Sequence, residues 1–199
     1  KLVPVEIYSE TRMSTEIGIS RTTMKDALVR LSQDKYIDII PRKGFQLNVM
    51  TRDDIFGTYQ ARTAVEGYCA LHLSRNRDTA AGKHTLRLMD DSIQTMDDLL
   101  NEDADISAVL DCDLQFHKAM VDAVENKELI SLFELLNHRV SHIAMDSFME
   151  PGRPQEALEE HKAIYQAILA SKAEADATPY LSVEQHMKAS AKIALKHLE

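Results

Sequence analysis

The chain has 199 residues, of which 44% are hydrophobic and 28% are charged, and its formal net charge is −9. This composition excludes a disordered chain, because enough apolar side chains are present to form a packed core. The chain has only six glycines and five prolines. This argues against β-sandwich and β-barrel folds, because these folds need many turns. Two cysteines without a CxxC pair, and the lack of an apolar run of membrane-spanning length, predict a cytoplasmic protein without a membrane partner.

Charge is distributed unevenly along the chain. Residues 1–52 carry nine Lys and Arg against six Asp and Glu, whereas residues 53–199 carry fourteen against twenty-six. All eight histidines lie in the second part. A basic segment joined to an acidic, histidine-rich segment indicates two domains with different roles. We place these domains at residues 1–50 and 51–199.

The first segment has the pattern of a winged helix-turn-helix. Residues 10–17 predict a short helix, Gly18 ends it, and Ser20 is suited to cap a second helix over residues 21–33. An apolar stripe at helical spacing on the second helix is formed by Met24, Ala27, Leu28 and Leu31. Alternating hydrophobic residues on both sides of residues 41–44 predict a β-hairpin, and these are Ile37, Ile39, Phe45, Leu47 and Val49.

The hydrophobic pattern of the second segment predicts helices and no strands. These helices cover residues 53–76, 79–100, 106–124, 129–149, 156–169 and 179–198. Pro151 and Pro154 are expected to separate the fourth of them from the fifth. The predicted fold class is therefore mainly α, with an N-terminal winged helix-turn-helix followed by an all-α antiparallel bundle of about six helices.

The second helix of the first segment is a candidate for reading DNA. A helix that enters the major groove presents polar and basic residues at its start and buries its opposite face. Arginine can make a bidentate contact with guanine, while Ser and Thr can bind phosphate. The candidate contacts on this helix and at the hairpin tip are Ser20, Arg21, Thr22, Thr23, Lys25, Arg30, Arg42 and Lys43. The alternative is an amphipathic helix with an ordinary charged face, and the hairpin that follows favours DNA binding.

One aspartate and three histidines form a candidate metal site in the second segment. Asp113 and His117 are four residues apart, so a helix places both on one face. His161 and His186 lie on later predicted helices. One carboxylate and three imidazoles can hold Zn²⁺, Ni²⁺ or Mn²⁺. The alternative for the first pair is a solvated ion pair. Two further histidines with the same spacing compete as ligands, namely His138 and His142.

The stretch MSTEIGISRTTMKDALVRLSQDKYIDIIPRKGF carries a Gly-x-Ser-Arg-Thr start, an Ala-Leu pair on the following helix and a hairpin glycine at Gly44. This pattern resembles the winged-helix domain of the GntR superfamily of bacterial regulators. Thr23 stands where that family usually has proline. Only nine residues precede Glu10, so the family's first helix is expected to be absent or truncated. That loss would leave Leu28 and Leu31 exposed.

A second motif lies in the acidic segment. The stretch DCDLQFHKAMVDAVENKEL resembles the Asp-x-x-Phe-His…Asn-x-x-Leu signature of the FCD ligand-binding domain, which is attached to one GntR subfamily. In that family the aspartate, this histidine and one histidine from each of two later helices bind a metal. The resemblance thus implies the ligands Asp113, His117, His161 and His186, with zinc as the favoured ion and nickel or manganese as alternatives.

The resemblance also implies a ligand pocket beside the metal. Arg62 and Glu66 match the family's Arg-x-x-x-Glu on the first helix of this domain. Because the family binds small organic acids, Arg62 is a candidate partner for a carboxylate, and Arg139 is a second candidate. The alternative is a surface ion pair between Arg62 and Glu66, which would contribute at most about half a kcal/mol.

Together these observations predict a DNA-binding transcription regulator and not an enzyme. The helical domain would bind a divalent metal and a small carboxylate effector, and the effector would change the affinity for double-stranded operator DNA. A homodimer is implied by the resemblance. Two alternatives remain open: a hydrolase-like metalloenzyme that uses the Asp/His site, and a helical dimerisation module whose histidines are incidental.

Overall fold

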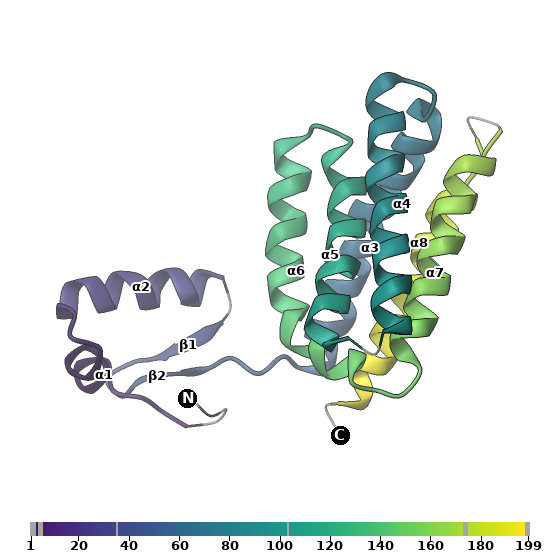
Figure 1. Cartoon of the computed structure of the whole chain (residues 1–199). Helices are drawn as coiled ribbons and strands as arrows, with labels where there is room; N and C mark the ends of the chain where they lie inside the picture. Colours follow the sequence, from purple (N-terminus) through teal and green to yellow (C-terminus); the bar gives the residue numbers. More distant parts are fainter. Residues whose placement is uncertain (1–2, 4–5, 35, 103, 173–174, 198–199) are drawn as a thin grey trace. The chain divides into compact units, whose positions relative to one another are not determined.

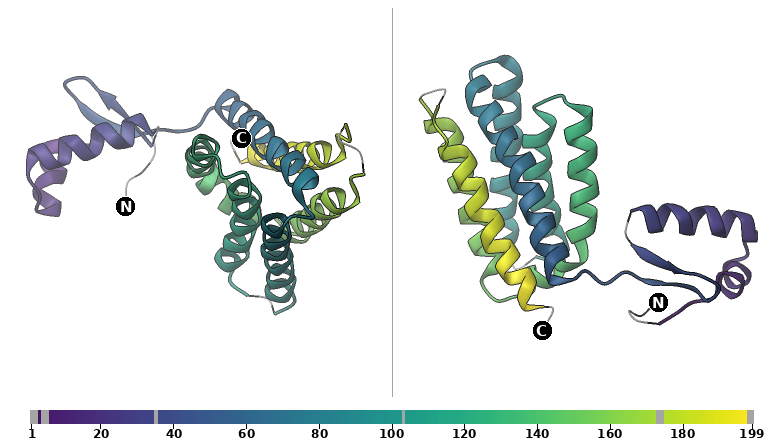
Figure 2. Two further views of the ribbon diagram at one scale, coloured as in Figure 1. Left: turned by 90° about the horizontal axis from the view of Figure 1, so that it is seen from above. Right: turned by 180° about the vertical axis from the view of Figure 1, so that it is seen from behind.

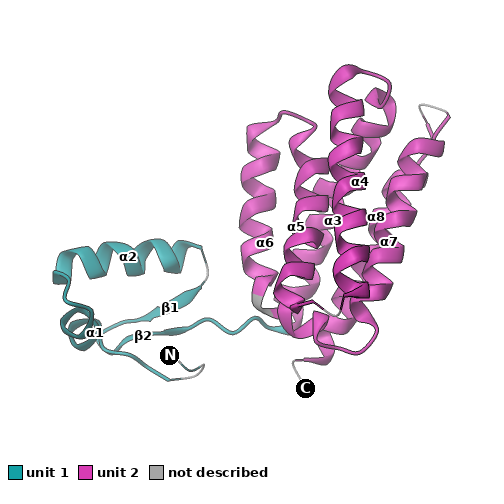
Figure 3. Ribbon diagram, viewed as in Figure 1, with its two compact units in different colours: residues 1–51 teal, residues 52–199 magenta. Residues whose placement is uncertain are grey.

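The computed structural model describes residue 3 and residues 6–34, 36–102, 104–172 and 175–197 (Figure 1). The chain divides into two compact units, residues 1–51 and residues 52–199 (Figure 3). The division lies one residue later than the position expected from the charge distribution.

Unit 1 contains the helices α1 (Glu10–Ile17) and α2 (Arg21–Gln33), followed by the strands β1 (Ile37–Ile40) and β2 (Gly44–Leu47). Gly18 ends α1 in the left-handed conformation, with φ 77°. Ser20 caps α2, because its side chain accepts a hydrogen bond from the backbone N–H of Thr23. The order of elements agrees with the predicted winged helix-turn-helix.

The hairpin is antiparallel, with Ile37 opposite Leu47 and Ile39 opposite Phe45. Tyr8 forms an additional bridge to Phe45 at the edge of the hairpin. Gly44 is required there, because its φ is 134° and a Cβ atom would overlap the Tyr8 carbonyl group. The apolar side chains Ile37 and Phe45 of the hairpin pack against Met24 and Leu28 of α2.

The core of unit 1 corrects the predicted apolar stripe of α2. Met24 and Leu28 are buried together with Ile37 and Phe45. Ala27 is exposed, and Leu31 is 39% exposed. The expected exposure of Leu31 is therefore observed, whereas that of Leu28 is wrong, because the hairpin covers the edge of α2 that carries Leu28.

Unit 2 is an all-helical bundle. Its helices are α3 (Arg52–Asn76), α4 (Ala80–Asn101), α5 (Ile106–Asp122), α6 (Lys127–Phe148), α7 (Arg153–Ala170) and α8 (Thr178–Lys196). Most ends lie within two residues of the predicted ones, but α7 begins three residues earlier. Pro154 lies in the first turn of α7 and does not separate it from α6. Proline is tolerated there because the first N–H groups of a helix have no partner within the helix.

Helix α3 contacts each of the other helices of the bundle. Figure 2 shows the bundle from above, with α3 crossing beside α8. These two helices approach closely at Gly67, where a Cβ atom would meet the ring of Tyr180. Each helix of the bundle contributes buried side chains to its core. In the part of the chain that the structure describes, no helix is both long and apolar enough to cross a membrane.

Candidate metal centre

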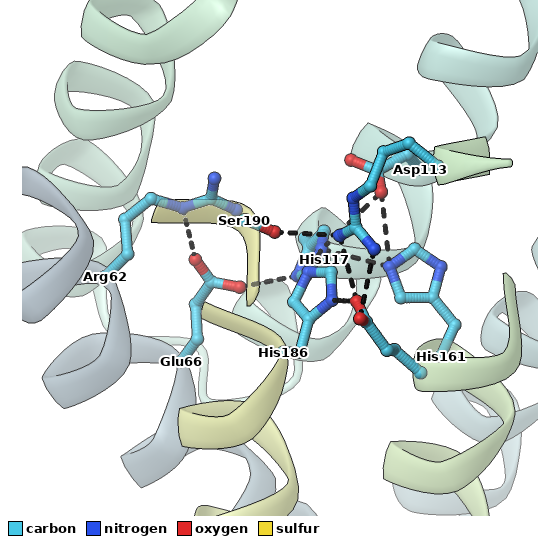
Figure 4. Close-up of polar contacts among 9 residues, drawn as sticks. Arg62, Glu66, Asp113, His117, His161, His186 and Ser190 are labelled. Carbon is cyan, nitrogen blue, oxygen red and sulfur yellow. Dashed lines mark hydrogen bonds and ion pairs between the residues drawn. The ribbon is translucent and has the colours of Figure 1, made fainter. Parts of the chain in front are cut away.

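The four side chains predicted as metal ligands lie together inside the bundle (Figure 4). Asp113 and His117 come from α5, His161 comes from α7 and His186 comes from α8. One ligand atom of each lies within 4.8 Å of all the others. The three histidines are buried. Helical spacing places the α5 pair on one face, and packing of the three helices completes the group.

The imidazole rings converge through their Nε2 atoms. Nε2 of His117 lies 3.2 Å from Nε2 of His161 and 3.2 Å from Nε2 of His186. Oδ1 of Asp113 lies 3.2 Å from Nε2 of His161 and 4.0 Å from Nε2 of His117. Three nitrogens and one oxygen thus surround one small volume.

Two glutamates face the other nitrogens of these rings. Oε2 of Glu66 lies 2.6 Å from Nδ1 of His117, and Oε2 of Glu160 lies 2.6 Å from Nδ1 of His186. At His186 this contact is a hydrogen bond, and a carboxylate acceptor favours the imidazole proton on Nδ1 with the Nε2 lone pair free. Oε2 of Glu66 and Nδ1 of His117 are buried and have no hydrogen-bond partner among the described residues. A cation held by the three Nε2 atoms and Asp113 would suit this buried polar cluster, so the arrangement fits a metal ion.

The charges of the centre suit metal binding at neutral pH. Burial lowers the pKa of His161 to about 4, although Asp113 opposes the shift. Burial also lowers the pKa of His186, against the influence of Glu160. For Asp113, burial raises the pKa, but the hydrogen bond from His161 and the nearby histidines outweigh it and lower the pKa. His161 and His186 are therefore neutral and Asp113 is ionised, which are the forms that bind metals.

Arg62 is attached to this centre through Glu66. Its Nε donates a 2.7 Å hydrogen bond to Oε1 of Glu66, and the guanidinium carbon lies 5.9 Å from the ring centroids of Tyr59 and Phe133. Arg62 is 7% exposed and Glu66 is fully buried, so the alternative of a surface ion pair is wrong. Burial opposes ionisation of Glu66, but Arg62 and His117 lower its pKa to about 2.

The remaining candidate residues of the bundle lie elsewhere. Arg139 pairs with Asp54 at 3.3 Å, and the contacts between described residues do not bring it to the centre. His138 is exposed, and the side chain of His142 lies outside the described ones. Two residues of the centre were missed from the sequence, Glu160 and Arg153. The only available signal was that Glu160 directly precedes the candidate ligand His161.

The candidate DNA contacts lie on the surface of unit 1. Arg21, Thr22, Lys25 and Arg30 are exposed along α2, and Arg42 and Lys43 are exposed in the turn of the hairpin. Ser20 and Thr23 are exposed too, but their hydroxyl groups are bonded to each other at 2.8 Å at the start of α2. These two residues therefore stabilise the helix start as well.

Comparison with known proteins agrees with this architecture. The family model described as the FCD domain matches residues 57–178. The HTH-type transcriptional regulator YdhC of Bacillus subtilis is 22% identical over 98% of this chain and 83% of its own. The structure of E. coli McbR/YncC superposes with a TM-score of 0.74 at 14% identity, covering 100% of this chain and 91% of that one. A GntR family member from Pseudomonas syringae gives a TM-score of 0.54 at 18% identity, covering 96% and 76%.

The FCD match covers more than half of the chain and contains the first three predicted metal ligands. The relative named above is a transcriptional regulator, which points away from an enzyme. The winged helix-turn-helix order of unit 1 and the helical bundle of unit 2 agree with that assignment. The chain therefore belongs to the FCD family of GntR-type transcriptional regulators.

Proposed function

We propose that this regulator binds a divalent transition metal and a small carboxylate effector in unit 2, and that the effector changes its affinity for operator DNA. The metal ligands are Asp113, His117, His161 and His186. The effector anchor is Arg62. The observation that carries the proposal is the buried chain of contacts from Arg62 through Glu66 to His117.

The metal-binding part of the proposal is supported by the donor atoms. Three imidazole nitrogens and one carboxylate oxygen suit Zn²⁺, Ni²⁺ or Mn²⁺, and a set rich in nitrogen favours zinc. The ligands come from α5, α7 and α8, so a bound ion would also tie three helices together. Its charge would offer a second attachment point to a carboxylate that reaches Arg62.

The effector-binding part of the proposal is supported by the environment of Arg62. Among the described residues, Arg62 donates a hydrogen bond to Glu66 through Nε alone, so its two terminal nitrogens can donate to a ligand. A carboxylate can pair with such a guanidinium group through two parallel hydrogen bonds. Thr58 lies one helical turn before Arg62 on α3, and its buried hydroxyl has no partner among the described residues. This hydroxyl provides a further polar group near the same helix face.

The DNA-binding part of the proposal assigns the operator contacts to the exposed residues of α2 and the hairpin tip. A homodimer would place two winged helices on a two-fold operator. The effector acts as a switch only if it binds one arrangement of the dimer more tightly than the other. The same coupling then makes operator DNA change the affinity for the effector by the same factor.

The first test measures the metal content of the purified full chain by elemental analysis. About one transition-metal ion per chain is expected, and a variant with both Asp113→Ala and His117→Ala should carry none. A control variant with His84→Ala, in an exposed position of α4, should keep the ion. Retention of metal by the double variant would overturn the assignment of the ligands.

The second test selects tight-binding duplexes from a random DNA pool with the metal-loaded protein. Enrichment of an inverted repeat is expected for a dimeric regulator. That duplex then serves as the probe for screening short mono- and dicarboxylic acids, and release or tightening of the complex identifies the effector. If no acid changes the binding of the protein to a confirmed operator, the effector-binding part of the proposal fails.

A further inference from the structure

A second buried arginine and a second glutamate are linked to the centre through His186. Glu160 belongs to α7 and directly precedes His161, while its Oε2 lies 2.6 Å from Nδ1 of His186 on α8. Arg153, at the start of α7, donates two hydrogen bonds to Glu160, at 3.0 Å from Nη1 to Oε1 and 2.9 Å from Nη2 to Oε2. Nη2 of Arg153 also lies 3.0 Å from Oγ of Ser190.

The burial of Arg153 needs an explanation. Its side chain is 2% exposed, although a guanidinium group at the first residue of a helix could extend into water. Desolvating this charge is unfavourable unless it is paired. The fork of two hydrogen bonds supplies the pairing and holds Glu160 in one orientation. The bond to Ser190, one turn after His186, attaches the same guanidinium group to α8.

We propose that Arg153 and Glu160 are positioning residues for the metal ligand His186. Glu160 accepts the Nδ1–H of His186, so that the Nε2 lone pair points to the centre, and Arg153 fixes Glu160 in place. This inference rests on the metal site proposed above. It assigns a role to residues that touch neither the metal site's donor atoms nor the effector anchor.

The three imidazole ligands are held in different ways. His117 has the contact with Glu66, and His186 has the hydrogen bond with Glu160. The ring of His161 stacks on Phe116, with centroids 4.2 Å apart and an angle of 12° between planes. Phe116 is fully buried, so this ring is fixed by packing. Of these three histidines, only His186 is held by the pair of Arg153 and Glu160.

Loss of the glutamate should weaken the metal site without removing a ligand. Without an acceptor at Nδ1, the ring of His186 can rotate and can carry its proton on Nε2, which is a form that does not bind metal. Partners of this kind typically change metal affinity by about 10- to 100-fold. The loss of Arg153 should act in the same direction, because Glu160 would then have more than one orientation.

The experiment compares Glu160→Ala, Glu160→Gln and Glu159→Gln in the full chain. Glu159 is the neighbouring exposed carboxylate and pairs with Lys162 at 2.9 Å, so it is the matched control. Zinc affinity is measured by competition with a chromogenic chelator, and the ligand geometry is followed by the visible spectrum of the cobalt-substituted protein. Thermal unfolding of the metal-free forms shows whether each variant is folded.

Glu160→Ala should lower zinc affinity by about 10- to 100-fold and change the cobalt spectrum. Glu160→Gln retains an oxygen acceptor and should lose less, whereas Glu159→Gln should match the wild type. Wild-type zinc affinity and an unchanged cobalt spectrum in Glu160→Ala would overturn the inference while leaving the metal site intact. If Glu160→Ala does not fold, Glu160→Leu is compared in its place, because it removes the acceptor and keeps most of the packing volume, and wild-type affinity and spectrum in that variant have the same consequence. If the wild type itself binds no zinc or cobalt, the proposed metal site fails and the inference with it.

Discussion

Nδ1 of His117 lies 2.6 Å from Oε2 of Glu66, and the second oxygen of this carboxylate accepts the hydrogen bond from Arg62. One buried carboxylate therefore contacts both a proposed metal ligand and the proposed effector anchor. A ligand that draws Arg62 away from Glu66 changes the charge balance beside His117. Binding of the metal and binding of the effector should consequently be coupled, and the coupling must be reciprocal.

Arg62→Lys tests the anchor with little loss of charge. Lysine keeps a cation near Glu66, but it lacks the planar fork that pairs with a carboxylate. We expect at least a tenfold weaker response to the effector acid in the operator-release assay, with about one metal ion per chain retained. Arg87→Lys, at an exposed position of α4, is the control. A parallel loss of metal in Arg62→Lys would show that Arg62 supports the metal centre and not the effector.

Arg21→Ala tests the reading helix. Arg21 is exposed at the first position of α2, where a recognition helix contacts base edges. The substitution should cost about 1–3 kcal/mol of specific affinity and relax the preference at one base position. Anisotropy titrations with the selected duplex and a scrambled duplex measure this difference. An unchanged curve for the selected duplex would place the reading surface elsewhere.

Acidification should destabilise the metal-free protein between pH 6.5 and 4. In the folded chain burial lowers the pKa of His161 to about 4 from the ordinary 6.5. Between these values the unfolded chain binds a proton that the folded chain does not, so the free energy of unfolding falls as pH falls. The slope for one such proton is about 1.4 kcal/mol per pH unit. His186 acts in the same direction, since burial lowers its pKa too.

Urea unfolding of the chelator-treated protein at several pH values measures this slope. His161→Gln removes one of the titrating groups and should flatten the dependence. His84→Gln changes an exposed histidine of α4 and should leave it as in the wild type. Equal slopes for the wild type and His161→Gln would contradict the assignment of a neutral, buried His161.

Two glycines of α3 should respond to alanine with opposite signs. A Cβ atom at Gly67 would meet the ring of Tyr180, whereas nothing lies within 4 Å of a Cβ atom at Gly57. Gly67→Ala should therefore lower the free energy of unfolding by about 1–3 kcal/mol through overpacking. Gly57→Ala should raise it by up to about 1 kcal/mol, because alanine favours the helix. Denaturant unfolding of both variants measures the two effects, and the same sign in both would contradict the close approach of α3 and α8.

Local signals in the sequence were sufficient for the elements of this protein. Caps and breaks such as Ser20 and Gly18 define α1 and α2, and hydrophobic spacing of 3.6 or 2 residues separates helices from strands. The uneven charge indicated two units, and the spacing of Asp113 and His117 together with the FCD-like motif indicated the four candidate metal ligands. These features are recognisable because they depend on residues a few positions apart or on a motif with defined spacing.

Only the tertiary structure decided which charged side chains are buried. Arg62 and Glu66 have the spacing of an ordinary surface pair, and nothing in the sequence around Arg153 marks a guanidinium group that is 2% exposed. Glu160 reaches His186 across 26 residues, because α7 packs against α8. Whether a charge is desolvated depends on the helices that cover it, and that packing is long-range. The sequence by itself therefore determined the helices, the two units and the four candidate ligands, while packing determined how the ligands are held.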